Sequence, residues 1–179
     1  MSCPKNLQGI GLSCADAMGG IKRVLIALAD DIKSVTIANG VVTALELNDT
    51  KSFKEFAFRK QTGQYTSTVA NDDAAGTSSV TTELTLQFSK ADNVKRLAIQ
   101  SLINANSVVI IETQMKDEDE LHTQYVYLGV DNPVTCTAAT QVSGTAVGDL
   151  NGFTITLQDL SRELPPFVDS AIVDQLVVA

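Results

Sequence analysis

The sequence has no tryptophan, one histidine and three cysteines among its 179 residues. Cys3, Cys14 and Cys136 are odd in number and form no C-x-x-C pair, which argues against a disulfide framework and favours a reducing compartment. With a single histidine, a histidine-based metal site would need cysteine partners at ligand spacing, and the sequence offers none. We interpret His122, in an alternating segment, as a surface or hydrogen-bonded strand residue rather than a catalytic base.

Long apolar runs and leader sequences are also missing. The run "VLIALA" (residues 24–29) is short and is closed by Asp30-Asp31. No stretch approaches the roughly 20 apolar residues of a membrane span. No signal peptide is apparent. We therefore expect a soluble protein with no membrane span, cytoplasmic where it is made.

Motifs for catalysis or cofactor binding are not recognisable. The segment "KDEDE" (residues 116–120) lacks the EF-hand spacing and its glycine. In "GIG" (residues 9–11) the following Leu12, Ser13 and Cys14 break the dinucleotide fingerprint, because Cys14 stands where its third glycine is needed. No signal selects a pair of carboxylates. We predict no enzyme activity and no catalytic, cofactor or metal site; a cytoplasmic enzyme with a dispersed site is one alternative.

The net charge of −8 is unevenly spread along the chain. Residues 1–60 hold eight basic and six acidic side chains, and residues 61–179 hold five basic and fifteen acidic ones. Such a protein should not hold nucleic acid by neutralising phosphates, although it can lie beside DNA without binding it tightly.

The order of patterns predicts a mainly β (α+β) fold: an antiparallel β-sandwich or half-barrel with one central helix. We expect a Gly-rich arm over residues 1–21, a single β domain over 22–166 and an apolar tail over 167–179, with Pro165-Pro166 ending the regular structure. Asn39-Gly40 predicts a tight hairpin. A helix is expected over 90–105, with Ser89 as N-cap. Its apolar stripe would consist of Val94, Leu97, Ala98, Leu102 and Ala105.

A long hairpin, expected over residues 53–89, is the most informative feature. Ser and Thr dominate its outer part, and from Val80 to Phe88 apolar and polar residues alternate with a period of two. Between Gln61 and Lys90 it contains neither Lys nor Pro, the residues that usually protect a free strand edge. We infer that copies of the chain pair their hairpins in a ring, so that the hairpin completes a closed barrel between subunits. The alternative is an ordinary exposed hairpin with a flexible tip.

The order of parts resembles that of phage tail tube proteins and their relatives in contractile injection machines. The resemblance covers about residues 22–170. It rests on the Thr-rich hairpin "EFAFRKQTGQYTST…SSVTTELTLQF", the helix "KADNVKRLAIQSLINAN", two strands around a polar loop, and "GDLNGFTITLQDLSRELPPFV". It implies a structural virion protein that forms rings, commonly six-fold, stacked into a tube that conducts viral double-stranded DNA to the host.

The implied roles fall on three sets of residues. The predicted lumen-facing set is Gln64, Thr66, Thr68, Thr81, Glu83 and Thr85, with the register of the first strand uncertain by one residue. The predicted anchors of the hairpin are Phe56, Phe58, Leu84, Leu86 and Phe88. The charges expected to meet between stacked rings are Lys51, Lys54, Arg59 and Lys60 on one side and Asp117, Glu118, Asp119 and Glu120 on the other.

Other readings remain open at this point. A chain of this design could form a ring of a short-tailed phage head–tail connector, or the tube of a contractile injection system. It could also be a β-sandwich binding or decoration protein of the virion, which would not need hairpins that pair between copies. In the first two readings it would have other virion proteins as partners.

Overall fold

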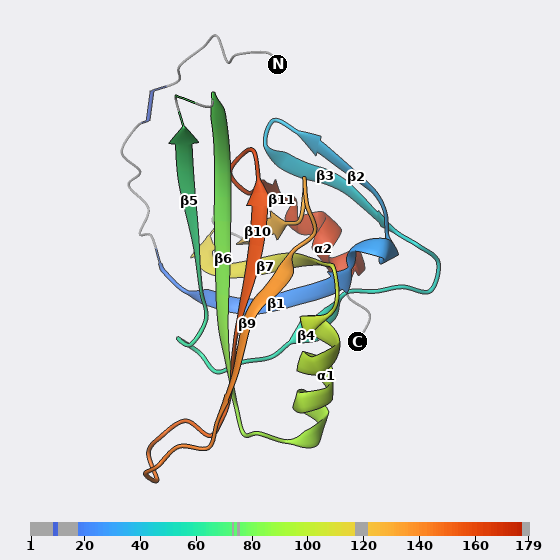
Figure 1. The fold of residues 1–179 in the computed structure, drawn as a ribbon. Helices are drawn as coiled ribbons and strands as arrows, with labels where there is room; N and C mark the ends of the chain where they lie inside the picture. The colour runs from blue at the N-terminus through green and yellow to red at the C-terminus, as the bar shows by residue number, and fades with distance from the viewer. Residues whose placement is uncertain (1–8, 11–17, 73, 75, 117–121, 177–179) are drawn as a thin grey trace.

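A computed structural model describes residues 9–10, 18–72, 74, 76–116 and 122–176. Two β-sheets pack face to face with their strands crossing (Figure 1). The larger sheet has seven strands in the spatial order β2 (Ile32–Ala38), β3 (Val41–Leu47), β11 (Phe167–Val168), β8 (Thr123–Leu128), β7 (Ser107–Lys116), β1 (Ile21–Leu28) and β4 (Lys54–Phe56). The smaller sheet has four: β5 (Gln64–Asp72), β6 (Thr77–Ser89), β10 (Gly152–Ser161) and β9 (Thr135–Val142). The helices are a 3-10 turn (Ala29–Asp31), α1 (Asn93–Ile103) and α2 (Ser170–Leu176).

The predicted mainly β fold is confirmed, and its two layers follow from where apolar residues fall. Strands β1 and β7 read as nearly continuous apolar runs because both faces of the seven-stranded sheet are covered. One face packs on the four-stranded sheet through residues such as Val24 and Ile111. The other face, with Leu25 and Ile110, packs against α2 and against side chains of the β2–β3 hairpin, which belongs to the same sheet.

Two tight turns with glycine set strand register. Asn39 and Gly40 have φ values of 52° and 77°, as a two-residue type I′ hairpin requires, so the predicted β2–β3 hairpin is confirmed. At the start of β10, a Cβ on Gly152 would lie 1.9 Å from the carbonyl oxygen of Phe88. Only glycine therefore allows β10 to approach β6 at this point.

The hairpin of the small sheet is shorter than the sequence predicts. It runs from Gln64 to Ser89, not from residue 53. Residues 54–56 instead form β4, which pairs with β1 in the other sheet. The alternation around Phe56 and Phe58 is real, but the chain crosses between the sheets over residues 57–63, and a period of two cannot show which sheet a strand joins.

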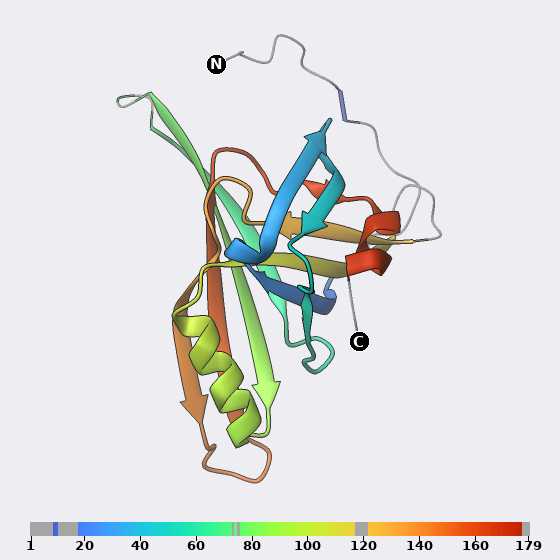
Figure 2. The same ribbon diagram turned by 90° about the vertical axis from the view of Figure 1, so that its right-hand side faces the viewer.

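Helix α1 also differs from its prediction. It spans Asn93–Ile103 rather than 90–105, and its N-cap is Asp92, whose carboxylate accepts a hydrogen bond from the Lys95 N–H at 2.9 Å. Ile99 and Leu102 are buried, whereas Val94 is 78% exposed and Leu97 54%. The predicted apolar stripe is therefore wrong in part. The helix lies at one side of the sandwich beside β9 (Figure 2), so it buries only a narrow face.

The C-terminal segment is part of the fold, contrary to the expectation that regular structure ends at Pro165-Pro166. Residues 167–168 form β11 between β3 and β8, and α2 follows. Val168, Val173 and Leu176 are buried in the same core cluster as Leu25 and Ile110. This insertion depends on strands distant in sequence, so local periodicity cannot reveal it. Among the described residues, no helix has the length and apolarity needed to cross a membrane.

Candidate channel-lining face and subunit edges

Strand β6 has one apolar face and one polar face. Val80, Leu84, Leu86 and Phe88 are buried, together with Thr82, against the seven-stranded sheet. Because successive side chains of a strand point to opposite faces, Thr81, Glu83 and Thr85 lie on the side away from this core.

The register of β5 brings all six predicted lumen residues onto one face. Gln64 pairs with Thr85, Thr66 with Glu83, and Thr68 with Thr81. Residues directly opposite each other in an antiparallel pair share a face. Whether that face lines a lumen is not decided by this register.

The polar face continues across the other two strands, which the sequence analysis did not assign to it. Thr154, Thr156 and Gln158 of β10 pair with Gln87, Thr85 and Glu83. On the far side, β9 places Thr140, Ala138 and Thr135 opposite the same three β10 residues. The Gln158 amide donates to the Glu83 carboxylate at 3.5 Å. The alternation in "FTITLQDL" was the signal that could have found the β10 part.

The charge of this face is weakly acidic. Of the described residues of the four strands that point to it, only Glu83 and Asp72 are charged, and Asp72 lies at the hairpin tip. Thr, Gln, Ser and Ala occupy most of the remaining positions, and Leu160, which lies opposite Thr81 and is 49% exposed, is an apolar exception. The face is therefore wettable and carries no basic side chain.

The two sheets differ in how their edges are protected. In the large sheet, edge strand β4 is only three residues long and edge strand β2 carries Lys33, which are ordinary devices against pairing between molecules. In the small sheet, edge strands β5 ("QYTSTVAND") and β9 ("TCTAATQV") have nine and eight residues without Lys, Arg or Pro. The small sheet thus has two long edges that can pair with other strands.

The predicted anchor residues all contact the core between the sheets. Leu84, Leu86 and Phe88 are buried. Phe56 and Phe58 are partly buried against the same cluster, but Phe56 belongs to β4 of the large sheet and Phe58 to the segment 57–63 that joins the sheets, not to the hairpin. The rings of Phe56 and Phe88 meet edge to face with centroids 6.3 Å apart, which connects the two layers.

In the predicted basic cluster, Lys51 and Lys54 line one hollow beside α1, and Arg59 lines another. Lys51 pairs with Asp31 at 3.1 Å, and Lys54 donates to the Ser52 hydroxyl at 3.3 Å. Arg59 and Lys60 lie in the segment 57–63, where Arg59 donates to the Ser89 hydroxyl at 3.0 Å. Their predicted partners, Asp117 to Glu120, lie outside the described residues.

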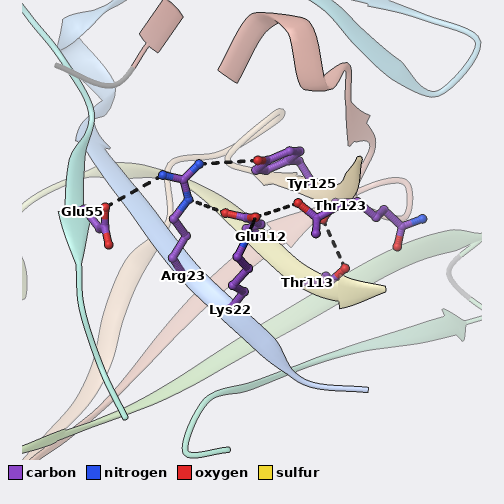
Figure 3. A network of polar contacts seen from close by, with 8 residues as sticks. Lys22, Arg23, Glu55, Glu112, Thr113, Thr123 and Tyr125 are labelled. Carbon is purple, nitrogen blue, oxygen red and sulfur yellow. Dashed lines mark hydrogen bonds and ion pairs between the residues drawn. The ribbon is translucent and has the colours of Figure 1, made fainter. Parts of the chain in front are cut away.

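A buried ion network lies on the outer face of the seven-stranded sheet (Figure 3). Glu112 of β7 is 1% exposed and accepts hydrogen bonds from Lys22 at 2.5 Å, from Thr123 at 2.6 Å and from Arg23. A register shift in β1 between Ile21 and Arg23 places both consecutive cations against this one carboxylate. Burial opposes its ionisation, but the hydrogen bonds from Lys22, Thr123 and Arg23 outweigh it and hold the pKa of Glu112 below its usual value.

This network links β1, β7 and β8 within one subunit and is not a reactive site. Both oxygens of Glu112 are engaged by donors of the same chain, so the carboxylate is held ionised and is not positioned to exchange a proton near neutral pH. Within the described ranges, no group of three or more His, Cys, Asp or Glu side chains could hold a metal ion.

A second buried carboxylate lies on the core side of β10. Asp159 is 1% exposed, and its Oδ1 has no hydrogen-bond partner among the described residues. Burial raises its pKa to about 6; the Gly129 N–H opposes this rise and the nearby charge of Asp131 adds to it.

Comparison of the chain with protein-family models, with curated proteins and with solved structures found no match.

Proposed function

We propose that the protein is a structural subunit of a virion ring, a component of a phage tail tube or of a related connector or injection tube. In this proposal the four-stranded sheets of neighbouring copies join edge to edge and enclose a channel that conducts viral DNA. The chain acts by assembly and performs no catalysis. It is made in the host cytoplasm and ends in the virion, with other tail or connector proteins as partners.

The observation that carries the proposal is the pair of long edges of the small sheet, neither of which contains Lys, Arg or Pro. The edges of the large sheet are protected against pairing between molecules and those of the small sheet are not. This difference supports a role for the small-sheet edges in pairing with other copies. The core side of the same sheet is buried and its other side is polar, so lateral pairing would extend the sheet without exposing apolar surface.

The strand directions allow the sheet to continue between copies. Each neighbouring pair in the order β5-β6-β10-β9 is antiparallel, so β5 and β9 run in opposite directions. When β9 of one copy lies beside β5 of the next, the alternation is unbroken. Such a contact joins two different surfaces, and it gives a closed ring when the rotation from one copy to the next divides a full turn. A barrel with several sheets in its wall is wide enough to hold water in its interior.

The polar face is suited to the passage of DNA. A basic surface would neutralise phosphates, release counterions and bind the duplex tightly. Glu83 adds a negative charge per copy to a face of Thr and Gln, so phosphates would be repelled weakly along the channel.

The proposal is tested by blocking the edges. Val69 in β5 is 50% exposed, and Ala139 in β9 is also exposed. Both side chains lie on the core side of the small sheet, the side that faces the large sheet. Val69→Lys and Ala139→Lys add a charge where a paired neighbour would bury it, while the isolated subunit can keep the lysine in water. Thr36→Lys, on the exposed edge strand β2 of the other sheet, is the matched control.

We expect wild type and Thr36→Lys to form rings by negative-stain electron microscopy and light scattering. Both edge variants should remain monomeric, with unchanged circular dichroism. Wild-type protein that stays monomeric at high concentration would refute the proposal. So would rings that still form from the two edge variants.

A further inference from the structure

The two ends of the four-stranded sheet carry charge of opposite sign. The tip end is where β5 ends and β6 begins, with the turns 129–134 and 161–166 beside it. The helix end is where β6 ends and α1 begins, with the loop 57–63 and the β9–β10 loop beside it. In Figure 1 the tip end is at the top and the helix end is at the bottom.

The helix end is basic. Its acidic side chains are Asp92, which caps α1 and pairs with Lys95 at 3.3 Å, and Asp149, whose pKa is lowered by hydrogen bonds from the N–H groups of Ala146 and Thr145 at 2.8 Å. Both carboxylates are charged, and basic side chains outnumber them. The basic side chains at this end are Arg59, Lys60, Lys90, Lys95 and Arg96.

The helix end is also hollowed and partly apolar. Arg59 and Lys90 line a hollow of about 580 Å³ between the loop 57–63 and the β9–β10 loop. Val147 of that loop is fully exposed, and Val94 at the start of α1 is 78% exposed.

The tip end is acidic. Asp72, Asp131 and Glu163 are exposed there. The described basic residue at this end, Arg162, is already paired with Asp131 at 3.0 Å. Apolar side chains again lie among the charges, with Leu164 61% and Val130 42% exposed.

We propose that the helix end of one copy binds the tip end of a copy in the adjoining ring, so that rings stack in one direction only. This inference rests on the proposed ring. Contact of two helix ends or of two tip ends would bring like charges together, whereas contact of unlike ends pairs the charges and buries apolar residues from both. Because this contact relates neighbouring rings by a shift along the ring axis, its repetition does not close and yields a filament. The acidic partner is the tip end, in place of the segment Asp117 to Glu120 expected from the sequence.

Charge reversal at one end should stop stacking and leave rings intact. Lys60→Glu with Lys90→Glu makes the helix end acidic, and Asp131→Lys with Glu163→Lys makes the tip end basic. None of these four residues lies in the edge strands β5 and β9. Lys33→Glu, in the outer sheet, is a control for reversal of a lysine elsewhere.

We expect wild type and Lys33→Glu to form tubes at about 50 mM salt that shorten to rings at about 500 mM, because exposed charges are then screened. Each double variant should give rings with tube length reduced about tenfold or more. Rings of the two variants, assembled separately and then mixed, should stack again, because each reversed end now meets a complementary one.

Two results would overturn the inference while leaving the ring proposal standing. One is tubes of wild-type length from either double variant, and the other is mixed rings that do not stack. If the wild-type chain forms no rings at all, the proposed function fails first, and the stacking inference fails with it.

Discussion

Asp159 provides a test of the packing between the two sheets. Its carboxyl group lies on the core side of β10, opposite Thr82, and burial raises its pKa from 3.8 to about 6. One oxygen has no partner among the described residues, so nothing compensates fully for the loss of water around the ionised form. We predict that Asp159→Asn, which has the same shape without the charge, stabilises the protein at neutral pH.

The sign and size follow from proton linkage. Because the folded-state pKa is higher than the unfolded one, the folded protein binds the proton more tightly. Its contribution to stability is complete below about pH 4 and is lost as pH rises through 6. A shift from 3.8 to about 6 corresponds to about 3 kcal/mol of unfolding free energy lost by pH 7. Asp159→Asn should not show this loss.

The assay is urea unfolding at pH 4, 5, 6 and 7 in a Val69→Lys background, which keeps the subunit monomeric under the proposed function. The difference in unfolding free energy between the two proteins should grow by about 3 kcal/mol from pH 4 to pH 7, with most of the change between pH 4 and 6. Other titrating groups are common to both proteins and cancel in this difference. Parallel pH profiles would refute the argument that Asp159 is buried without sufficient hydrogen bonds.

Three further predictions follow. Glu112→Gln removes the carboxylate that two cations share. It should lower stability by about 2 kcal/mol at pH 7 and by progressively less as the pH falls below 4.5, because the pKa of Glu112 is depressed and its contribution is lost as the carboxylate is protonated; urea unfolding over this pH range measures this. Leu84→Ala, at a fully buried position between the sheets, should cost about 3 kcal/mol in the same assay, and a loss below about 1 kcal/mol would contradict the packing of the sandwich. Thr81→Lys with Thr85→Lys, both in the inner strand β6 and not on a sheet edge, adds two positive charges per copy to the polar face. Rings of this variant should retain duplex DNA on a filter at low salt and release it at high salt, whereas wild-type rings that retain DNA equally would exclude a non-binding channel.

Local patterns predicted those elements whose neighbours in sequence are also neighbours in space. The Asn39-Gly40 hairpin and the two faces of β6 are of this kind, because a turn signal determines the first and a period of two the second. The six residues predicted to share a polar face do so because β5 and β6 are joined by a short connection.

Predictions failed where contacts between distant segments decide the structure. The Phe56 segment joined β1 rather than the hairpin, and β11 entered the large sheet between β3 and β8. Val94, Leu97 and Leu102 fit one helical stripe in the sequence, yet Val94 and Leu97 are exposed and Leu102 is buried. The difference arises because α1 lies at the side of the sandwich and buries only a narrow face. The β10 and β9 parts of the polar face were missed for the same reason, because alternation within a strand does not show which strands lie beside it.

The abundance of Ser and Thr in the small sheet can be explained by three requirements that act on the same strands. A strand that is buried on one face needs a residue with β propensity on the other, and Thr supplies this without apolar exposure. An edge that pairs with another copy must lack Lys and Pro, and a channel that lets DNA slide must lack basic groups. Glu or Asp throughout would satisfy the last two conditions, but like charges directly opposite one another across β5 and β6 would destabilise the sheet. Thr and Ser meet all three conditions at Thr66, Thr68, Thr81 and Thr85, and Glu83 is tolerated because Thr66 and Gln158, both uncharged, are its cross-strand partners.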